Sequence, residues 1–193
     1  MVTELNTNEP RSRTTVIHWL FLVVVAGIAI ALDQATKAYV SAHLDRYESW
    51  MPVDFIEPVF KFTHVHNTGA AFGMFPQGST LFLAIAITIV GVILYYYRNL
   101  PFGGWVVRFA LSLQIAGALG NVIDRVRLGY VVDFFNVVYW PVFNVADSCV
   151  VIGVVLLALE ILREEWRASR QQPSEDDTSE NGSSSSPEKQ VFG

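Results

Sequence analysis

Aspartate, asparagine and basic side chains are paired at three points of this 193-residue chain, each time at helical spacing. The pairs are Asp33 with Lys37, Asn121 with Arg125, and Asn144 with Asp147. Residues three or four positions apart lie on one face of a helix. Two carboxyl groups that share one proton can activate a water molecule and protonate a leaving amine. Aspartic peptide hydrolysis is therefore the first chemistry that these residues indicate.

The residues next to each aspartate in the sequence indicate which two aspartates form such a dyad. Asp147 lies inside the apolar run 142–162, and an ionisable residue within a membrane span usually faces a partner or a cavity. Asp133 stands between two valines and two phenylalanines, a setting that raises the pKa of an enclosed carboxyl group. Asp124 is followed by Arg125, which favours a charged, structurally paired carboxylate. We predict Asp133 and Asp147 as the dyad, with Asp124 and Asp147 as the alternative.

Four apolar stretches of the chain, almost free of charged residues, are expected to form the helices that carry these residues. Hydrophobic residues make up 52% of the chain and charged residues only 16%, against about 25% in soluble domains. The runs cover residues 16–32, 81–97, 105–123 and 142–162, and each is long enough to cross a bilayer as a helix. We predict an all-α polytopic membrane protein, with four transmembrane helices and a small extracytoplasmic β-strand and loop element. A hydrophobic soluble bundle is the weaker alternative.

The distribution of lysine and arginine orients the predicted spans. With a cytoplasmic N-terminus, eight of the thirteen basic residues fall on the cytoplasmic side, and four of these are arginines at helix ends. We therefore predict both termini in the cytoplasm and the loops 33–80 and 124–141 together on the outer side. At the outer end of the first span, the spacing of Asp33 and Lys37 also has a simpler interpretation, as no more than an interfacial ion pair.

The two ends of the chain are expected to lie outside the folded domain. Residues 171–193 hold five acids, one lysine, six serines and two prolines, and so supply −4 of the net charge of −5. Such a segment buries too little apolar surface to offset its ordering entropy. We predict disordered segments 1–14 and 171–193 around a four-helix membrane domain 15–170. The run 16–32 has an alternative interpretation as a cleaved signal peptide, but three further spans favour a retained helix.

The first outer loop contains a strand pattern. Phe60, Phe62 and Val65 alternate roughly with polar residues, which is typical of a short strand or hairpin near the membrane surface. The pattern continues into residues 67–73, where Gly69 permits close approach of another backbone. A simple turn over 67–73 is an equal alternative.

Other chemistries have less support in the sequence. There is no HExxH zinc motif, no GxSxG serine elbow and no glycine-rich phosphate loop. His64 and His66 lie near each other on the predicted strand, but without further ligands at familiar spacing we expect solvated residues rather than a metal site. Cys149 is expected to be a small packing residue. Two other functions stay open, a small proton-coupled transporter that uses the same aspartates and a non-enzymatic assembly subunit.

The chain closely resembles the lipoprotein signal peptidase family, also called signal peptidase II, the bacterial intramembrane aspartic proteases. Five sequence blocks carry the resemblance, in order and among the four spans. They are DQATK at 33–37, NTGAAFG at 67–73, GALGNVIDR at 117–125, GYVVDF at 129–134 and FNVADS at 143–148. The resemblance covers roughly residues 16–165, whereas the acidic tail is not part of the shared pattern.

This resemblance implies a specific reaction and place. Family members remove the signal peptide from prolipoproteins immediately before a cysteine that carries a diacylglyceryl group. The expected partners are therefore these prolipoproteins and membrane lipids, with no nucleic acid and with the chain acting as a monomer. The expected location is the bacterial cytoplasmic membrane, with the active site near its outer face. No metal or organic cofactor is expected.

The resemblance also assigns roles by motif. Asp133 and Asp147 correspond to the catalytic pair, in agreement with the prediction from their surroundings. Supporting or substrate-binding roles are implied for nine further residues, namely Asp33, Lys37, Asn67, Gly69, Asn121, Asp124, Arg125, Asn144 and Ala146.

Overall fold

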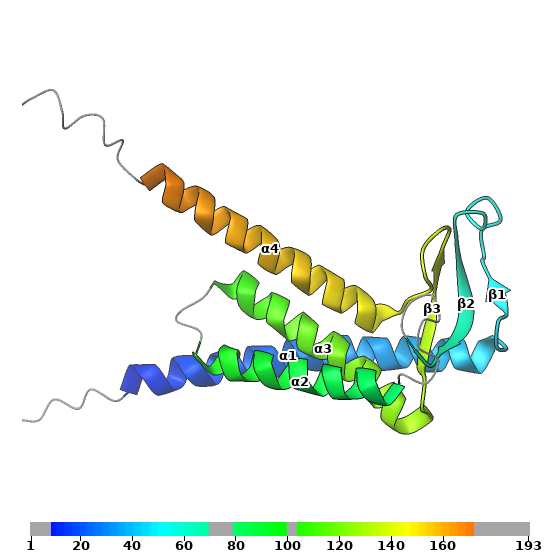
Figure 1. Ribbon diagram of the computed structural model, residues 1–193, viewed down its shortest axis with the longest axis horizontal. Coiled ribbons are helices and arrows are strands. Elements are labelled where there is room, and N and C mark those ends of the chain that lie inside the picture. Colours follow the sequence, from blue (N-terminus) through cyan, green and yellow to red (C-terminus); the bar gives the residue numbers. More distant parts are fainter. Residues whose placement is uncertain (1–8, 70–78, 100–103, 172–193) are drawn as a thin grey trace, which may run out of the picture. The chain divides into compact units, whose positions relative to one another are not determined.

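The computed structural model describes residues 9–69, 79–99 and 104–171 and is shown in Figure 1. Its four helices are α1 (Glu9–His43), α2 (Ser79–Asn99), α3 (Trp105–Leu128) and α4 (Val145–Gln171). Each helix contains a segment that is long and apolar enough to cross a membrane. The predicted class of a four-span helical membrane protein is therefore confirmed.

Helix α1 is longer than the sequence pattern predicts. We expected its apolar run to end at Leu32 and a loop to start at Asp33, but the helix continues to His43. The stretch 33–43 contains neither glycine nor proline, and so nothing in its backbone ends the helix. The helix also begins at Glu9, within the segment 1–14 that we expected to be disordered, because Pro10 is tolerated in a first helical turn.

Two small apolar clusters pack the helices against one another, one between α1, α2 and α3 and one between α1, α3 and α4. One cluster joins Leu22 of α1, Val90, Ile93 and Tyr97 of α2, and Ile115 of α3. The second is made of smaller side chains and includes Cys149 of α4, which is buried as a packing residue. Many large apolar side chains outside these clusters are exposed, as expected where lipid rather than water surrounds the helices.

A three-stranded antiparallel sheet lies at the end of these helices where α1 terminates (Figure 1). It consists of β1 (Ser49–Trp50), β2 (Phe60–Asn67) and β3 (Val131–Val137), in the order β1-β2-β3. The strand predicted from Phe60 is confirmed as β2. Strand β3 was not predicted, because its first four residues are all buried and show no alternation of apolar and polar side chains.

Two glycines bring α4 against α3. A Cβ atom at Gly153 would lie 2.7 Å from the carbonyl oxygen of Ala110, and one at Gly117 would overlap the carbonyl of Ala146. Close approach of these two helices therefore depends on the missing side chains, as expected for small residues in membrane helices.

The chain divides into two compact units, Met1–Glu160 and Ile161–Gly193. All of the sites discussed below lie in the first unit. In the second, residues 161–170 continue α4 and are exposed, and Arg170 stacks over the ring of Trp166. The predicted disordered tail 171–193 lies outside the described residues apart from Gln171.

Candidate active site

Asp133 projects from β3 into a buried polar cluster. Its side chain is only 2% exposed, and both carboxylate oxygens accept hydrogen bonds from asparagine amides. Asn67 Nδ2 donates to Oδ2 at 2.9 Å, and Asn144 Nδ2 donates to Oδ1 at 2.7 Å. The first contact follows from strand register, because Asn67 pairs with Val131 and Asp133 is two residues further along the same strand face.

Asp147 lies in the first turn of α4, where it forms a capping box with Asn144. The Asn144 side-chain oxygen accepts the backbone N–H of Asp147 at 2.9 Å, and Asp147 Oδ2 accepts the backbone N–H of Asn144 at 3.2 Å. The other carboxylate oxygen, Oδ1, accepts a 2.7 Å hydrogen bond from Asn121 Nδ2 on α3. Asp147 is therefore positioned by two helices.

Asn144 connects the two predicted catalytic carboxylates. Its amide group contacts Asp133, and its backbone N–H and side-chain oxygen both bind Asp147. The residue is completely buried, and its amide also lies 3.1 Å from Asn121 Oδ1. One asparagine thus fixes both aspartates to the start of α4.

A buried ammonium group lies on the other side of Asn121. Lys37 Nζ contacts Asp33 at 2.8 Å, Asp124 at 2.9 Å and the Asn121 side-chain oxygen at 3.0 Å. All three of its donors are thereby used. Asp33 and Lys37 do form the ion pair that their spacing suggests, but the pair is almost fully buried between helices and also includes Asp124.

Asp124 is part of this ion cluster. Besides Lys37, it accepts the backbone N–H of Val132 at 3.1 Å and the side-chain amide of Gln34 at 3.0 Å. The sequence suggested Arg125 as its charge partner, but the ion pair is formed with Lys37 instead. Because both oxygens of Asp124 are engaged in holding elements together, its geometry favours a structural role over the alternative dyad.

Asp33 connects α1 to the start of α4. Its Oδ1 accepts the backbone N–H of Ala146 at 2.9 Å, across a contact that Gly120 makes possible. A Cβ atom at Gly120 would lie 2.7 Å from Asp33 Oδ2. The role predicted for Ala146 is therefore exercised through its backbone.

Gln34 is a member of the cluster that the sequence analysis missed. Its amide nitrogen lies within hydrogen-bond distance of Asp33, Asp124 and the carbonyl of Gly120. The available signal was its position between the polar residues of the block DQATK.

Arg125 reaches the edge of the cluster with one buried donor, Nε, that is unpaired in the described part of the chain. Its Nη1 donates to the carbonyl of Asn121 at 3.3 Å, and its guanidinium lies 5.8 Å from the ring centre of Phe82. Among the described residues, its buried Nε has no hydrogen-bond partner. Such a group can donate to a ligand that enters the site.

The environment of Asp133 changes its acidity. Burial, followed by the negative charge of Asp147, raises the pKa of Asp133 from 3.8 to about 7. The amides of Asn67 and Asn144 and the ammonium of Lys37 act in the opposite direction. Near neutral pH the Asp133 carboxyl group therefore holds a proton part of the time, as a general acid must.

The histidines of β2 do not match the expectation of solvated side chains. His64 is buried, with Nδ1 2.8 Å from the carbonyl oxygen of Leu44, and His66 stacks on Tyr130. Burial, and then the positive neighbours His64 and Arg46, lowers the pKa of His66. In the described part of the chain, no three His, Cys, Asp or Glu side chains are grouped to hold a metal ion.

Gly69 is the last described residue before a gap. Its backbone N–H donates to the side-chain oxygen of Asn67 at 3.0 Å, which orients the amide toward Asp133. The remainder of the predicted turn, residues 70–73, lies outside the described residues. All eleven predicted site residues thus belong to one connected region at the sheet end of α1 and α3.

Comparisons with known proteins identify relatives over most of the chain. The family described as "Signal peptidase (SPase) II" matches residues 25–163. The lipoprotein signal peptidase of Halothermothrix orenii is 44% identical over 142 residues, covering 74% of this chain and 95% of the relative. That of Geobacter sulfurreducens is 43% identical over 155 residues, covering 77% and 94%.

Solved structures agree with these relatives. A structure described as a bacterial membrane enzyme, obtained by the in meso method at 2.3 Å resolution, superposes with a TM-score of 0.71. It is 31% identical and covers 80% of this chain and 93% of its own. A second bacterial membrane enzyme, at 1.9 Å, has a TM-score of 0.67 at 32% identity, covering 74% and 92%.

Proposed function

The chain belongs to the signal peptidase II family of lipoprotein signal peptidases, and on this premise we propose that Asp133 and Asp147 form its catalytic dyad. Family membership makes the chain a membrane peptidase and sets aside the transporter and assembly-subunit hypotheses. In the proposed reaction the enzyme cleaves a prolipoprotein immediately before its diacylglyceryl cysteine. The observation that carries this proposal is the contact of Asn144 with both aspartates.

The two aspartates have different roles in this mechanism. Asp147, whose oxygens accept N–H groups from Asn121 and Asn144, takes a proton from a water molecule as the water oxygen attacks the scissile carbonyl carbon. Asp133, with its pKa near 7, is protonated and donates a hydrogen bond to the carbonyl oxygen. When the tetrahedral intermediate collapses, the C–N bond breaks and the leaving amine takes a proton from the dyad.

The surrounding polar residues hold this geometry. Lys37 binds Asn121, which in turn binds Asp147, so the ammonium supports the charged base through one amide. Asn67 and Asn144 direct the Asp133 carboxyl group. Arg125 offers its unpaired Nε to a carbonyl oxygen of the substrate backbone.

We place this site near the outer face of the cytoplasmic membrane, with both chain termini in the cytoplasm. The lysine and arginine distribution supports this orientation. We also propose that the enzyme acts as a monomer.

Replacement of each aspartate by asparagine tests the dyad. We expect Asp133→Asn and Asp147→Asn each to lower kcat by about 10³-fold or more, because neither amide can exchange the proton. The measurement is cleavage of a diacylglyceryl-modified prolipoprotein by purified enzyme in lipid nanodiscs. Asp54→Asn, on the exposed outer loop, is the matched control and keeps full activity.

The same series distinguishes the two dyads. Loss of cleavage in Asp124→Asn together with normal cleavage in Asp133→Asn would support the alternative pair instead. Normal cleavage in both Asp133→Asn and Asp147→Asn would show that neither aspartate is catalytic.

A further inference from the structure

The imidazole ring of His66 stacks on the phenol ring of Tyr130 beside the proposed dyad. The ring centroids are 3.9 Å apart and the ring planes meet at 18°. His66 lies near the end of β2, and Tyr130 directly precedes β3, which carries Asp133. Neither ring takes part in the mechanism proposed above. We refer to this contact as the His66–Tyr130 stack.

The pairing of β2 with β3 changes register before it reaches the stack. Three residue pairs, from Phe60 to Phe62, are followed by a β-bulge in which Thr63 and His64 oppose Phe134. Only three pairs remain beyond the bulge, namely Val65 with Asp133, His66 with Val132, and Asn67 with Val131. The register of these last three pairs therefore has to be fixed separately from the rest of the sheet.

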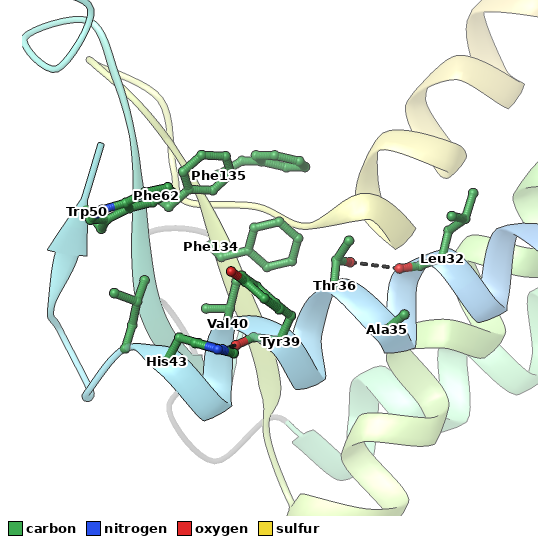
Figure 2. Close-up of a pocket in the computed structure, with 11 residues that line it drawn as sticks. Leu32, Ala35, Thr36, Tyr39, Val40, His43, Trp50, Phe62, Phe134 and Phe135 are labelled. Carbon is green, nitrogen blue, oxygen red and sulfur yellow. Dashed lines mark hydrogen bonds between the residues drawn. The ribbon is translucent and has the colours of Figure 1, made fainter. Parts of the chain in front are cut away.

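Aromatic side chains fix the sheet before the bulge. Figure 2 shows the rings of Trp50, Phe62 and Phe135 one after another across the strands. The centroids are 6.1 Å apart between Trp50 and Phe62 and 5.9 Å apart between Phe62 and Phe135. Phe60 adds a further contact with Phe135 at 6.1 Å. None of these four residues belongs to a pair beyond the bulge.

The end of the sheet beyond the bulge has little support from the backbone. Strand β2 continues toward α2, whereas β3 begins directly after α3, so no tight turn joins the two strands here. Val132, in the middle pair, donates its N–H to Asp124 at 3.1 Å, and its carbonyl accepts the Asn144 amide at 3.4 Å. Both backbone groups thus bind side chains outside the sheet rather than β2. Contacts between side chains must therefore fix the register of the last pairs.

The contact of Asn67 with Asp133 depends on this register. Asn67 and Asp133 are diagonal neighbours on one face of the two strands, and His66 and Tyr130 are the equivalent neighbours on the other face. A slip by one residue would turn Asn67 to the opposite face and end its 2.9 Å hydrogen bond to the carboxylate. Stacked rings stabilise one mutual arrangement, and so the stack opposes such a slip.

The stack is also anchored to the end of α1. The His64 and His66 rings meet edge to face with centroids 4.9 Å apart, and His64 Nδ1 lies 2.8 Å from the carbonyl oxygen of Leu44. Because a carbonyl can only accept, His64 Nδ1 carries the proton in this contact. Within the described residues His66 itself forms no hydrogen bond, and its contacts are ring contacts. Another flat ring at position 66 should therefore serve equally well.

From this arrangement we propose that His66, stacked on Tyr130, is a positioning residue of the peptidase reaction, which fixes the register that holds the Asn67 amide on the Asp133 carboxyl group. The assignment rests on the proposed function, since the register matters for cleavage only if Asp133 is catalytic. His66 does not act on the substrate; it acts through Asn67.

Two substitutions of His66 separate the stacked ring from the imidazole. Burial is the main cause that lowers the pKa of His66, and so phenylalanine matches the neutral ring present near pH 7. We expect His66→Ala to lower kcat about fivefold, and His66→Phe to keep the wild-type value. The measurement is cleavage of a diacylglyceryl-modified prolipoprotein by purified enzyme in lipid nanodiscs.

The pH profile distinguishes positioning from a general loss of stability. The Asn67 hydrogen bond lowers the pKa of Asp133, so its loss in His66→Ala should move the alkaline fall of kcat/KM to higher pH by about half a unit. The other charged residues that face Asp133 are the same in every variant, namely Asp147, Lys37 and Arg125.

Two further variants test the route through Asn67. In an Asn67→Ala background, His66→Ala should cause no additional loss of kcat, because the contact that it maintains is already absent. Phe60→Ala is the matched control, since it removes a ring contact of the same strand on the other side of the bulge. It should leave the pH of the alkaline fall unchanged.

Each other outcome has a defined meaning. Wild-type kcat and pH profile in His66→Ala, or an equal loss of kcat with and without the Asn67 side chain, would overturn the positioning role. A loss in His66→Phe as large as that in His66→Ala would overturn the stack, because the imidazole itself would then be required. A carbon-13 NMR titration of Asp133 separates these results from failure of the proposed function. If the wild type cleaves nothing while the pKa of Asp133 still rises in His66→Ala, the proposed function fails and the effect of the stack on Asp133 stands.

Discussion

The two faces of α1 between residues 32 and 40 differ sharply in what surrounds them. On one face, Asp33 and Lys37 are almost fully buried and every ammonium donor has a partner. On the other, Leu32 and Tyr39 are exposed and line an apolar cavity between α1 and the sheet, the groove face of the helix. The two faces are about a third of a turn apart on the same helix. A single helical segment thus serves a polar, closed site and an apolar, open one.

The difference shows what permits charge in a membrane helix. Asp33 and Lys37 are stable there because α3 and the start of α4 bring acceptors and donors to them, namely Asn121, Asp124 and the Ala146 N–H. The lining of the groove face is mostly apolar, and its polar residues Thr36 and His43 contact carbonyl oxygens of α1 itself. Substitutions on the two faces should therefore have effects of different kind and size.

The largest effect is expected from removal of the buried cation. Lys37→Met leaves two carboxylates, Asp33 and Asp124, buried without their shared partner, which destabilises the fold by about 3–5 kcal/mol. Unfolding in detergent micelles measures this change. Tyr39→Met, on the groove face, is the control and should be much less destabilising. Equal decreases in unfolding free energy in the two variants would contradict the difference between the two faces of α1.

A smaller effect is expected from alkaline pH, and on one face only. Because the pKa of Asp133 is about 7, the proton that the mechanism requires is lost as pH rises above this value, and kcat/KM falls about tenfold per unit. The negative charge of Asp147 raises this pKa, and the ammonium of Lys37 lowers it. The measurement is kcat/KM for the prolipoprotein substrate over a pH series, and a value that does not fall above pH 7 would contradict this role of Asp133.

Stability follows the same titration. The pKa of Asp133 is higher in the folded protein than its ordinary value of 3.8, so the folded state is favoured at low pH and loses this advantage as pH rises through about 7.

The smallest effect is expected from a polar group on the groove face. Thr36→Val removes a hydroxyl that donates only to the carbonyls of Leu32 and Asp33 within its own helix. We expect a change in unfolding free energy within about 0.5 kcal/mol and cleavage within about twofold. A large loss in either measurement would show that this face depends on polar contacts after all.

Part of the fold and site could be predicted from residue pattern alone. The four apolar runs predict the four helices, and the alternation from Phe60 predicts β2. The apolar neighbours of Asp133 predict its raised pKa, because burial is the main cause of that shift. These features depend on residues that are close together in the sequence, and so one sequence is enough to predict them.

The features that were not predicted depend on contacts between distant residues. The ion pair of Lys37 with Asp124 joins α1 to α3. The sequence shows only the i, i+4 spacing of Lys37 with Asp33 and contains no signal for this second partner. The same holds for β3, whose two buried faces arise from neighbours on β2 and on the helices. Gln34 was missed because a single glutamine carries no charge to suggest a partner.

The position of Asn144 at the start of α4 has a consequence for biosynthesis. The exchange of hydrogen bonds between Asn144 and Asp147 exists only once the first turn of α4 has formed, and the same asparagine holds Asp133. While the ribosome is still producing α4, the three other described spans are already made, but the proposed dyad is not yet assembled. The proposed mechanism therefore predicts that activity appears only after α4 has been inserted into the membrane.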